Sequence, residues 1–252
     1  MLSKSPFPGP VCDCMIRPLF AAALTLAMTV SLPAAELTPQ SFEGEVTLKV
    51  GYKYLLTLPE GYAADANKKW PLVVFLHGAG ERGDNLELLK KHGPPKLIAA
   101  GKKFEAIVVC PQVHTGNVWN EQGVKALTDE IVRTHRVDTS RLYLTGISMG
   151  GFGTWDTALA YPDTYAAIAP ICGGAGIGFL LADRLKTQPC WIFHGDQDKA
   201  VTVEYSLQMH RALQKVGSPA KLTIYPGVAH DSWTQTYDNE EFWTWLFAQK
   251  KP

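Results

Sequence analysis

A serine flanked by glycines is the first residue in this sequence whose type and spacing could do chemistry. The stretch "LYLTGISMGG" (142–151) contains Ser148, two residues after Gly146 and two residues before Gly150. A serine at the sharp turn between a strand and a helix takes strained backbone dihedral angles, and glycines on either side avoid side-chain collisions. The pattern therefore indicates a nucleophilic serine, with a plain glycine-rich turn as the alternative.

A serine hydroxyl becomes a strong nucleophile only when a base takes its proton. In chains with this kind of elbow, an acid and then a histidine follow at later strand ends. Asp198 follows the apolar run "WIFHG", and His230 follows "LTIYPG". The order of the residues therefore predicts a catalytic triad of Ser148, Asp198 and His230.

Other residues compete for the roles of base and acid. His77 and His194 adjoin glycines at strand ends, where we expect them to be hydrogen-bonded turn residues. Asp196 lies two residues before Asp198, and the spacing alone leaves open which of the two orients the imidazole. The remaining histidines fall outside the order of serine, acid and base: His92, His114, His135 and His210.

An attacked carbonyl also needs donors for the developing oxyanion. The backbone N–H of Met149, directly after the serine, should supply one of them. The loop after the first buried strand, "HGAG" (77–80), should supply the second through Ala79. A plain glycine turn is the alternative for this loop.

Three further residues are candidates to line the substrate pocket. They are Trp119 and Asn120, after "PQVHTG", and Trp233 beside the histidine loop. Ordinary buried aromatic residues are an equally good interpretation of the tryptophans. The stretches "ERGDN" (81–85) and "KHGPPK" (91–96) are expected to be solvated loops that could form a rim.

Alternating strands and helices must position these residues. Apolar runs that end in loops predict strands, and residues 44–62 predict an N-terminal antiparallel hairpin. The alternation predicts an α/β fold with a mostly parallel central sheet and helices on both faces. Only residues 172–188 separate two of the predicted strands, so no large lid is expected. The predicted strands lie within the apolar runs 72–76, 104–112, 141–145, 164–174 (the strand being 165–171), 189–198 and 220–230; the predicted helices are 121–136, 152–161, 203–216 and 239–249.

Charge and the N-terminus limit the partners and the location. The 252 residues carry a formal net charge of zero, which gives no electrostatic footprint for nucleic acid. Arg17 precedes an apolar run, 19–32, that is too short to span a bilayer and ends in small residues. We therefore expect a signal peptide over 1–35, with translation starting at Met15, followed by one domain over 36–252. After cleavage we expect no stable membrane insertion and a secreted or periplasmic protein.

Cysteine usage gives no sign of a metal centre. Of the five cysteines, Cys110, Cys172 and Cys190 lie beyond the expected signal peptide, and no Cys/His spacing suggests a metal site. One disulfide among the three is neither required nor excluded by the sequence. We expect neither a metal nor an organic cofactor.

Several motifs together resemble the phospholipase/carboxylesterase branch of the α/β-hydrolases. They are "FLHGAGERGDN", "KHGPPKLI", "RLYLTGISMGGFGTWDTALAYPDTYAAIAPICGG", "HGDQDKAVTVEYS" and "YPGVAHDSW". The chain is similar to secreted "predicted peptidase" esterases and to polyhydroxybutyrate depolymerase-like and dienelactone hydrolase-like proteins. The resemblance covers residues 44–250 and implies that Asp198, rather than Asp196, is the acid. One departure is "DKAVTV", where relatives usually have Asp-Pro followed by a Val-Pro pair.

The resemblance implies hydrolysis of a carboxylic ester, either a small molecule or one linked to a polymer, through an acyl-enzyme on Ser148. Ala79 and Met149 would hold the oxyanion. A serine peptidase of the prolyl-oligopeptidase type is the alternative enzyme, and a non-catalytic binding protein on the same fold is a further alternative.

Overall fold

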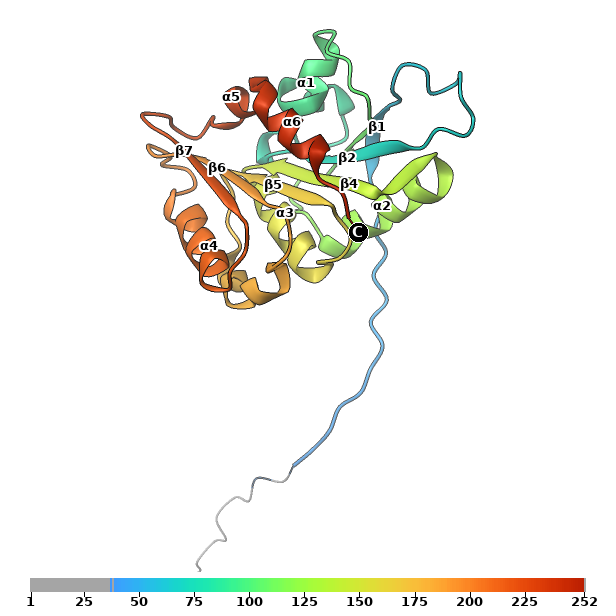
Figure 1. The fold of residues 1–252 in the computed structure, drawn as a ribbon. Coiled ribbons are helices and arrows are strands. Elements are labelled where there is room, and N and C mark those ends of the chain that lie inside the picture. The colour runs from blue at the N-terminus through green and yellow to red at the C-terminus, as the bar shows by residue number, and fades with distance from the viewer. Residues whose placement is uncertain (1–36, 38, 252) are drawn as a thin grey trace, which may run out of the picture. The chain divides into compact units, whose positions relative to one another are not determined.

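The computed structural model describes residue 37 and residues 39–251. All of its helices and strands lie in one compact unit, Leu48–Pro252 (Figure 1). The predicted signal peptide and the predicted start at Met15 lie outside the described residues. The predicted domain boundary at residue 36 stays a prediction.

A seven-stranded sheet forms the centre of this unit. Its strand order is β1-β3-β2-β4-β5-β6-β7, and only β1, at one edge, runs antiparallel to its neighbour. The predicted fold class, a mostly parallel sheet with helices on both faces, is therefore confirmed. The strands are β1 Lys53–Thr57, β2 Trp70–Leu76, β3 Ile107–Gln112, β4 Val137–Ile147, β5 Ala167–Ile171, β6 Trp191–Gly195 and β7 Lys221–Tyr225.

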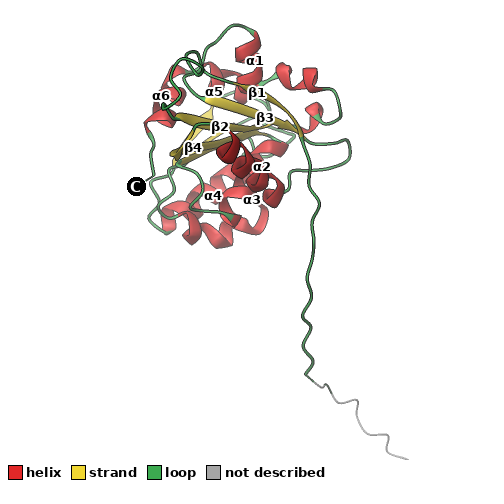
Figure 2. Ribbon diagram, turned by 90° about the vertical axis from the view of Figure 1, so that its right-hand side faces the viewer, coloured by secondary structure: helices red, strands yellow, loops and turns green. Residues whose placement is uncertain are grey.

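Both faces of the sheet are buried, which explains the continuous apolar runs of the central strands. Along β2, Leu72, Val74 and Leu76 pack into one core, and Val73 and Phe75 pack into the core on the opposite face. Helices α1, α5 and α6 cover one face, and α2, α3 and α4 cover the other (Figure 2). The helices are α1 Gly93–Ala99, α2 Glu121–Thr134, α3 Met149–Ala160, α4 Glu204–Lys215, α5 Trp233–Asp238 and α6 Glu240–Ala248.

The predicted N-terminal hairpin is wrong. Only β1 forms within residues 44–62, and it pairs with β3, so that Leu55 lies opposite Cys110. Residues 44–50 are not in a strand. The physical reason is the connection: a hairpin needs a loop of at least two residues, and only Gly51 separates the two apolar runs.

Short helices occupy connections for which the sequence predicted loops. Helix α1 begins within "KHGPPK" because Pro94 and Pro95 occupy its first turn, where no intrahelical N–H is required. The 3₁₀ helix η3, Gly176–Leu185, fills the connection between β5 and β6, so no large lid is inserted there. The predicted closing helix, 239–249, forms as α6, and the side chain of Asn239 caps its N-terminus; the short helix α5 before it was not predicted.

Candidate active site

The turn between β4 and α3 holds Ser148 in a strained conformation. Ser148 has φ 51° and ψ −116°, which a non-glycine residue rarely adopts. Its backbone N–H donates to the carbonyl of Ile171 at 2.9 Å, which ties the turn to the end of β5. Such strain typically costs about 1–3 kcal/mol and is found where a site requires it.

The glycines around Ser148 are there because neighbouring backbones come very close. A Cβ atom on Gly146 would collide with the carbonyl of Gly150. A Cβ atom on Gly150 would collide with the carbonyl of Leu76, at the end of β2. The steric reason for the sequence pattern is therefore visible in the structure.

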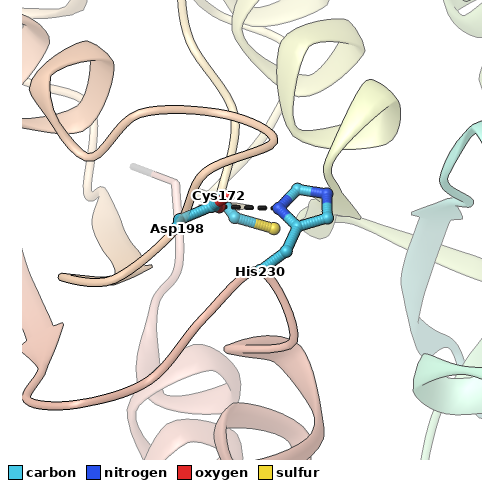
Figure 3. A group of neighbouring side chains, drawn as sticks. All are labelled: Cys172, Asp198 and His230. Atoms are coloured by element: carbon cyan, nitrogen blue, oxygen red, sulfur yellow. Dashed lines mark hydrogen bonds and ion pairs between the residues drawn. The ribbon is translucent and has the colours of Figure 1, made fainter.

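A continuous chain of hydrogen bonds joins the three predicted triad residues. The hydroxyl of Ser148 lies 2.9 Å from Nε2 of His230 and can donate to it. On the other side of the ring, Nδ1 of His230 lies 2.6 Å from Oδ2 of Asp198 (Figure 3). With Nδ1–H donating to the carboxylate, Nε2 is free to accept the serine proton.

The loop after β6 fixes the carboxylate of Asp198. Its Oδ1 accepts the N–H groups of Ala200 and Val201, each at 2.9 Å. Burial by itself would raise the pKa of Asp198, but the hydrogen bonds from His230 and from these amides lower it below its usual value. Asp198 is therefore ionised at neutral pH and can stabilise an imidazolium.

His194 supports the same loop from beneath. The His194 side chain is fully buried. Its Nε2 donates to the carbonyl of Val201 at 2.8 Å and also lies 3.2 Å from Oδ2 of Asp198. Burial lowers the pKa of His194, which keeps the ring neutral. Asp196 instead accepts the N–H of Gly227 at 2.7 Å and so joins the loop after β6 to the loop after β7. This agrees with the expectation that Asp198, rather than Asp196, is the acid.

The thiol of Cys172 lies beside this pair. The ligand atoms of Cys172, Asp198 and His230 are all within 4.8 Å of one another, the one such group among the described residues with the donors for a metal ion. Burial raises the pKa of the thiol to about 12, so it stays protonated. A metal would have to displace that proton and break the bond between Asp198 and His230. Cys110, Cys172 and Cys190 are all free and buried.

Each of the two predicted oxyanion donors is the first residue of a helix. Ala79 is the first residue of the 3₁₀ helix η1, Ala79–Glu81, and Met149 is the first residue of α3. The first amides of a helix have no acceptor within it, so both N–H groups are available to an oxyanion. Each of these residues lines a cavity together with Ser148.

Buried polar contacts hold the Ala79 loop in place. Nε2 of His77 accepts the N–H of Val113 at 3.0 Å, so its Nδ1 carries the proton and donates to the carbonyl of Gly78. Burial lowers the pKa of His77 to about 4, and the ring is neutral. Nε1 of Trp119 donates to the carbonyl of His77 at 3.0 Å. The prediction that His77 is a hydrogen-bonded turn residue is confirmed.

Arg82 is a supporting residue that sequence reasoning missed. Its Nε donates to the carbonyl of Ala79 at 3.0 Å, and its guanidinium also donates to the carbonyl of Asn117 at 3.3 Å. Arg82 thereby joins the Ala79 loop to the loop before α2. Nothing local in "GER" indicates this pairing, because the partner loop lies 35 residues away.

Ser148 lies between two cavities. The first has a volume of about 410 Å³, and its lining includes Trp119, Met149 and Phe152. The second has a volume of about 310 Å³, and its lining includes His230 and Trp233. The ring of Trp233 meets that of His230 edge-on, at a centroid distance of 5.2 Å.

The remaining pocket candidate has a local role. The side chain of Asn120 accepts the N–H of Gly123 at 2.8 Å and so caps α2. Asn120 lines a groove next to Val118 rather than either cavity at Ser148. Asp156, which the sequence did not single out, lines the first cavity, and desolvation together with nearby Glu121 raises its pKa to about 6.

Known proteins with similar sequences are hydrolases of the esterase type. The chain is 32% identical over 173 residues to poly(3-hydroxyalkanoate) depolymerase C of Paucimonas lemoignei, covering 62% of this chain and 39% of that protein. It is 28% identical over 165 residues to a probable feruloyl esterase C of Aspergillus terreus, covering 63% of this chain and 59% of that protein. In both cases the match spans less than two thirds of the relative.

Solved structures and a family model agree with this assignment. A thermostable esterase superposes with a TM-score of 0.68 at 30% identity, covering 79% of this chain and 59% of that chain. An acylaminoacyl peptidase of Pyrococcus horikoshii, at 18% identity and a TM-score of 0.57, shares the fold, with 74% of this chain and 36% of that chain covered. Residues 94–241 match the model of the dienelactone hydrolase family. The chain therefore belongs to the dienelactone hydrolase family and is an esterase-like α/β-hydrolase.

Proposed function

We propose that this protein is a secreted or periplasmic serine esterase that cleaves carboxylic esters through an acyl-enzyme. Ser148 is the nucleophile, His230 is the general base and then the general acid, and Asp198 holds the imidazole in the required tautomer. The observation that carries the proposal is the hydrogen-bond chain of 2.9 Å and 2.6 Å through the two nitrogens of His230. It supplies a base for the hydroxyl and a carboxylate for the base.

The reaction proceeds in two halves. Oγ of Ser148 attacks the acyl carbon while His230 takes its proton, and the N–H groups of Ala79 and Met149 stabilise the oxyanion. His230 then gives the proton to the leaving alcohol, and the acyl group stays on Ser148. A water molecule, deprotonated by His230, attacks the acyl carbon; His230 then returns that proton to Oγ of Ser148 as the acid leaves.

The two cavities accommodate different parts of the ester. The leaving oxygen must receive its proton from His230, so the alcohol lies in the cavity that His230 lines, here called the alcohol cavity. The acyl chain lies in the other cavity, here called the acyl cavity, against Trp119, Met149 and Phe152. The apolar walls of the acyl cavity suit a short or aromatic acyl group.

The relatives support the class of substrate. Their names describe a polyester depolymerase and a feruloyl esterase, both of which act on esters. The connection between β5 and β6 holds only η3, which leaves the site open to esters that are attached to a polymer.

Secretion is the part of the proposal that depends on the N-terminal sequence. Arg17 and the apolar run after it support a signal peptide, and one relative is an uncharacterized secreted protein of Arthroderma benhamiae, 26% identical. No helix in the described part of the chain is long and apolar enough to cross a membrane.

Hydrolysis of matched chromogenic substrates tests the activity. The protein should cleave p-nitrophenyl butanoate much faster than an aminoacyl p-nitroanilide, and a fluorophosphonate should label the wild type but not Ser148→Ala. Faster cleavage of the anilide would favour a peptidase. No labelling and no turnover of either compound would favour a non-catalytic binding protein.

A further inference from the structure

The alcohol cavity contains a buried carboxyl group that the reaction does not use. Glu81, the last residue of η1, is only 5% exposed and lines this cavity together with Ser148 and His230. Its Oε2 lies above Gly78, 3.2 Å from where a Cβ atom of that residue would be. The side chain therefore folds back over the loop that carries the oxyanion donor.

Neither carboxyl oxygen of Glu81 accepts a hydrogen bond from any residue that the structure describes. Among the described residues, its one ion-pair partner is Nε2 of His92, 3.8 Å from Oε1, which is too long for a direct hydrogen bond. Both carboxyl oxygens keep some contact with solvent although the residue is buried. They can therefore accept hydrogen bonds from a molecule in the alcohol cavity, which Ser148 also lines.

His92 and Trp233 line the alcohol cavity together with Glu81. Nε1 of Trp233 donates to Nδ1 of His92 at 3.2 Å, so the proton of a neutral His92 is on Nε2, which faces Glu81. The rings of His92 and Trp233 meet edge-on, with centroids 5.3 Å apart. Trp233 also contacts His230, so this wall is continuous with the proposed base.

We propose that Glu81 is a specificity-determining residue that accepts hydrogen bonds from hydroxyl groups on the alcohol part of the ester. This inference rests on the proposed esterase function and on the position of the leaving alcohol beside His230. The substrates it selects are esters of polyols or sugars, whose hydroxyl groups lie within a few bonds of the ester oxygen. A carboxylate also accepts hydrogen bonds from an ammonium group, so an amino ester is included in the test.

The test compares two esters that share their acyl group and carbon skeleton. They are 2,3-dihydroxypropyl butanoate and propyl butanoate, and kcat/KM is measured for each by titrating the released acid. Each value is divided by the rate of alkaline hydrolysis of the same ester, which removes the intrinsic difference in reactivity. The wild type should favour the dihydroxy ester by about tenfold or more, the effect of one to two hydrogen bonds to a buried acceptor.

Variants assign this preference to Glu81. Glu81→Gln keeps the size of the side chain but replaces one acceptor oxygen by an NH₂ donor. In this variant the ratio of the two normalised kcat/KM values should fall by about tenfold, mainly because KM for the dihydroxy ester rises. Glu81→Leu should abolish the preference. The matched control Glu87→Gln, an exposed glutamate that pairs with Lys90, should leave the ratio unchanged.

Three outcomes are informative. A wild type that shows no preference, or Glu81 variants that slow both esters equally, would overturn the inference while leaving the esterase proposal intact. A preference for 2-aminoethyl butanoate over both esters would replace hydroxyl recognition with recognition of a cation and would also overturn it. A wild type that cleaves no ester and resists fluorophosphonate would instead defeat the proposed function.

Discussion

Replacing Gly151 by alanine should separate the packing of the serine turn from its chemistry. Gly151 is in the first turn of α3, and a Cβ atom there would be 2.6 Å from the carbonyl oxygen of Ile171 and 2.9 Å from Cα of Gly173. Both neighbours are backbone atoms, and ordinary contact begins near 3.4 Å. The backbone must therefore shift by about 0.8 Å, and Ile171 is also the acceptor for the N–H of Ser148.

Two opposing effects set the size of the change in stability. Overpacking costs about 1–3 kcal/mol, and replacing a helical glycine by alanine returns about 1 kcal/mol. We expect Gly151→Ala to lower the free energy of unfolding in urea by about 0–2 kcal/mol. It should lower kcat/KM for p-nitrophenyl butanoate by about tenfold to a hundredfold, because a displacement approaching 1 Å misaligns the reacting groups.

The control for this experiment is Gly51→Ala, where a Cβ atom meets nothing within 4 Å. It should keep wild-type activity and stability. Wild-type kcat/KM in a stably folded Gly151→Ala would refute the reasoning that close backbone packing sets the position of Ser148.

Three further predictions concern Asp198, Arg82 and His77. Asp198→Asn should lower kcat about 10⁴-fold in the same assay with little change in KM, because the imidazole loses its orienting carboxylate; a loss under tenfold would contradict this role. Arg82→Ala should lower kcat about tenfold with an unchanged melting temperature, since it frees the Ala79 loop from Asn117, and unchanged kcat would argue against that role. The folded-state pKa of His77 is about 4, below the usual value near 6.5, so its stabilising contribution is present above pH 6.5 and is lost as the pH falls toward 4. The free energy of unfolding in urea should fall by an amount on the order of 3 kcal/mol between pH 7 and pH 4, and this fall should be absent in His77→Gln. Equal pH dependence of the unfolding free energy in the two proteins would contradict the prediction.

The sequence was sufficient for the elements and residues that local rules determine. The buried strands are visible as apolar runs, and the strained turn at Ser148 is visible because only glycine fits at Gly146 and Gly150. The candidates Asp198 and His230 could be selected because parallel strands end at one edge of the sheet, so residues far apart in sequence meet there. The structure brings these side chains within hydrogen-bonding distance.

Contacts between loops could not be predicted in the same way. Arg82 joins two loops that come together only in the folded chain, and the position of Glu81 against His92 depends on the same kind of approach. The predicted hairpin does not form because alternating apolar residues do not by themselves determine which strands pair, and the single Gly51 cannot reverse the chain. Asn120 follows Trp119 in the sequence, but its type and position are those of a helix cap.

The most direct test of the central claim is mass spectrometry of the protein after rapid mixing with p-nitrophenyl butanoate and acid quenching. The account predicts one butanoyl group per chain, attached to the peptide that contains Ser148, and an initial burst of p-nitrophenol of the same stoichiometry. A butanoyl group on another residue such as Cys172, or turnover with no acylated protein and no burst, would contradict it.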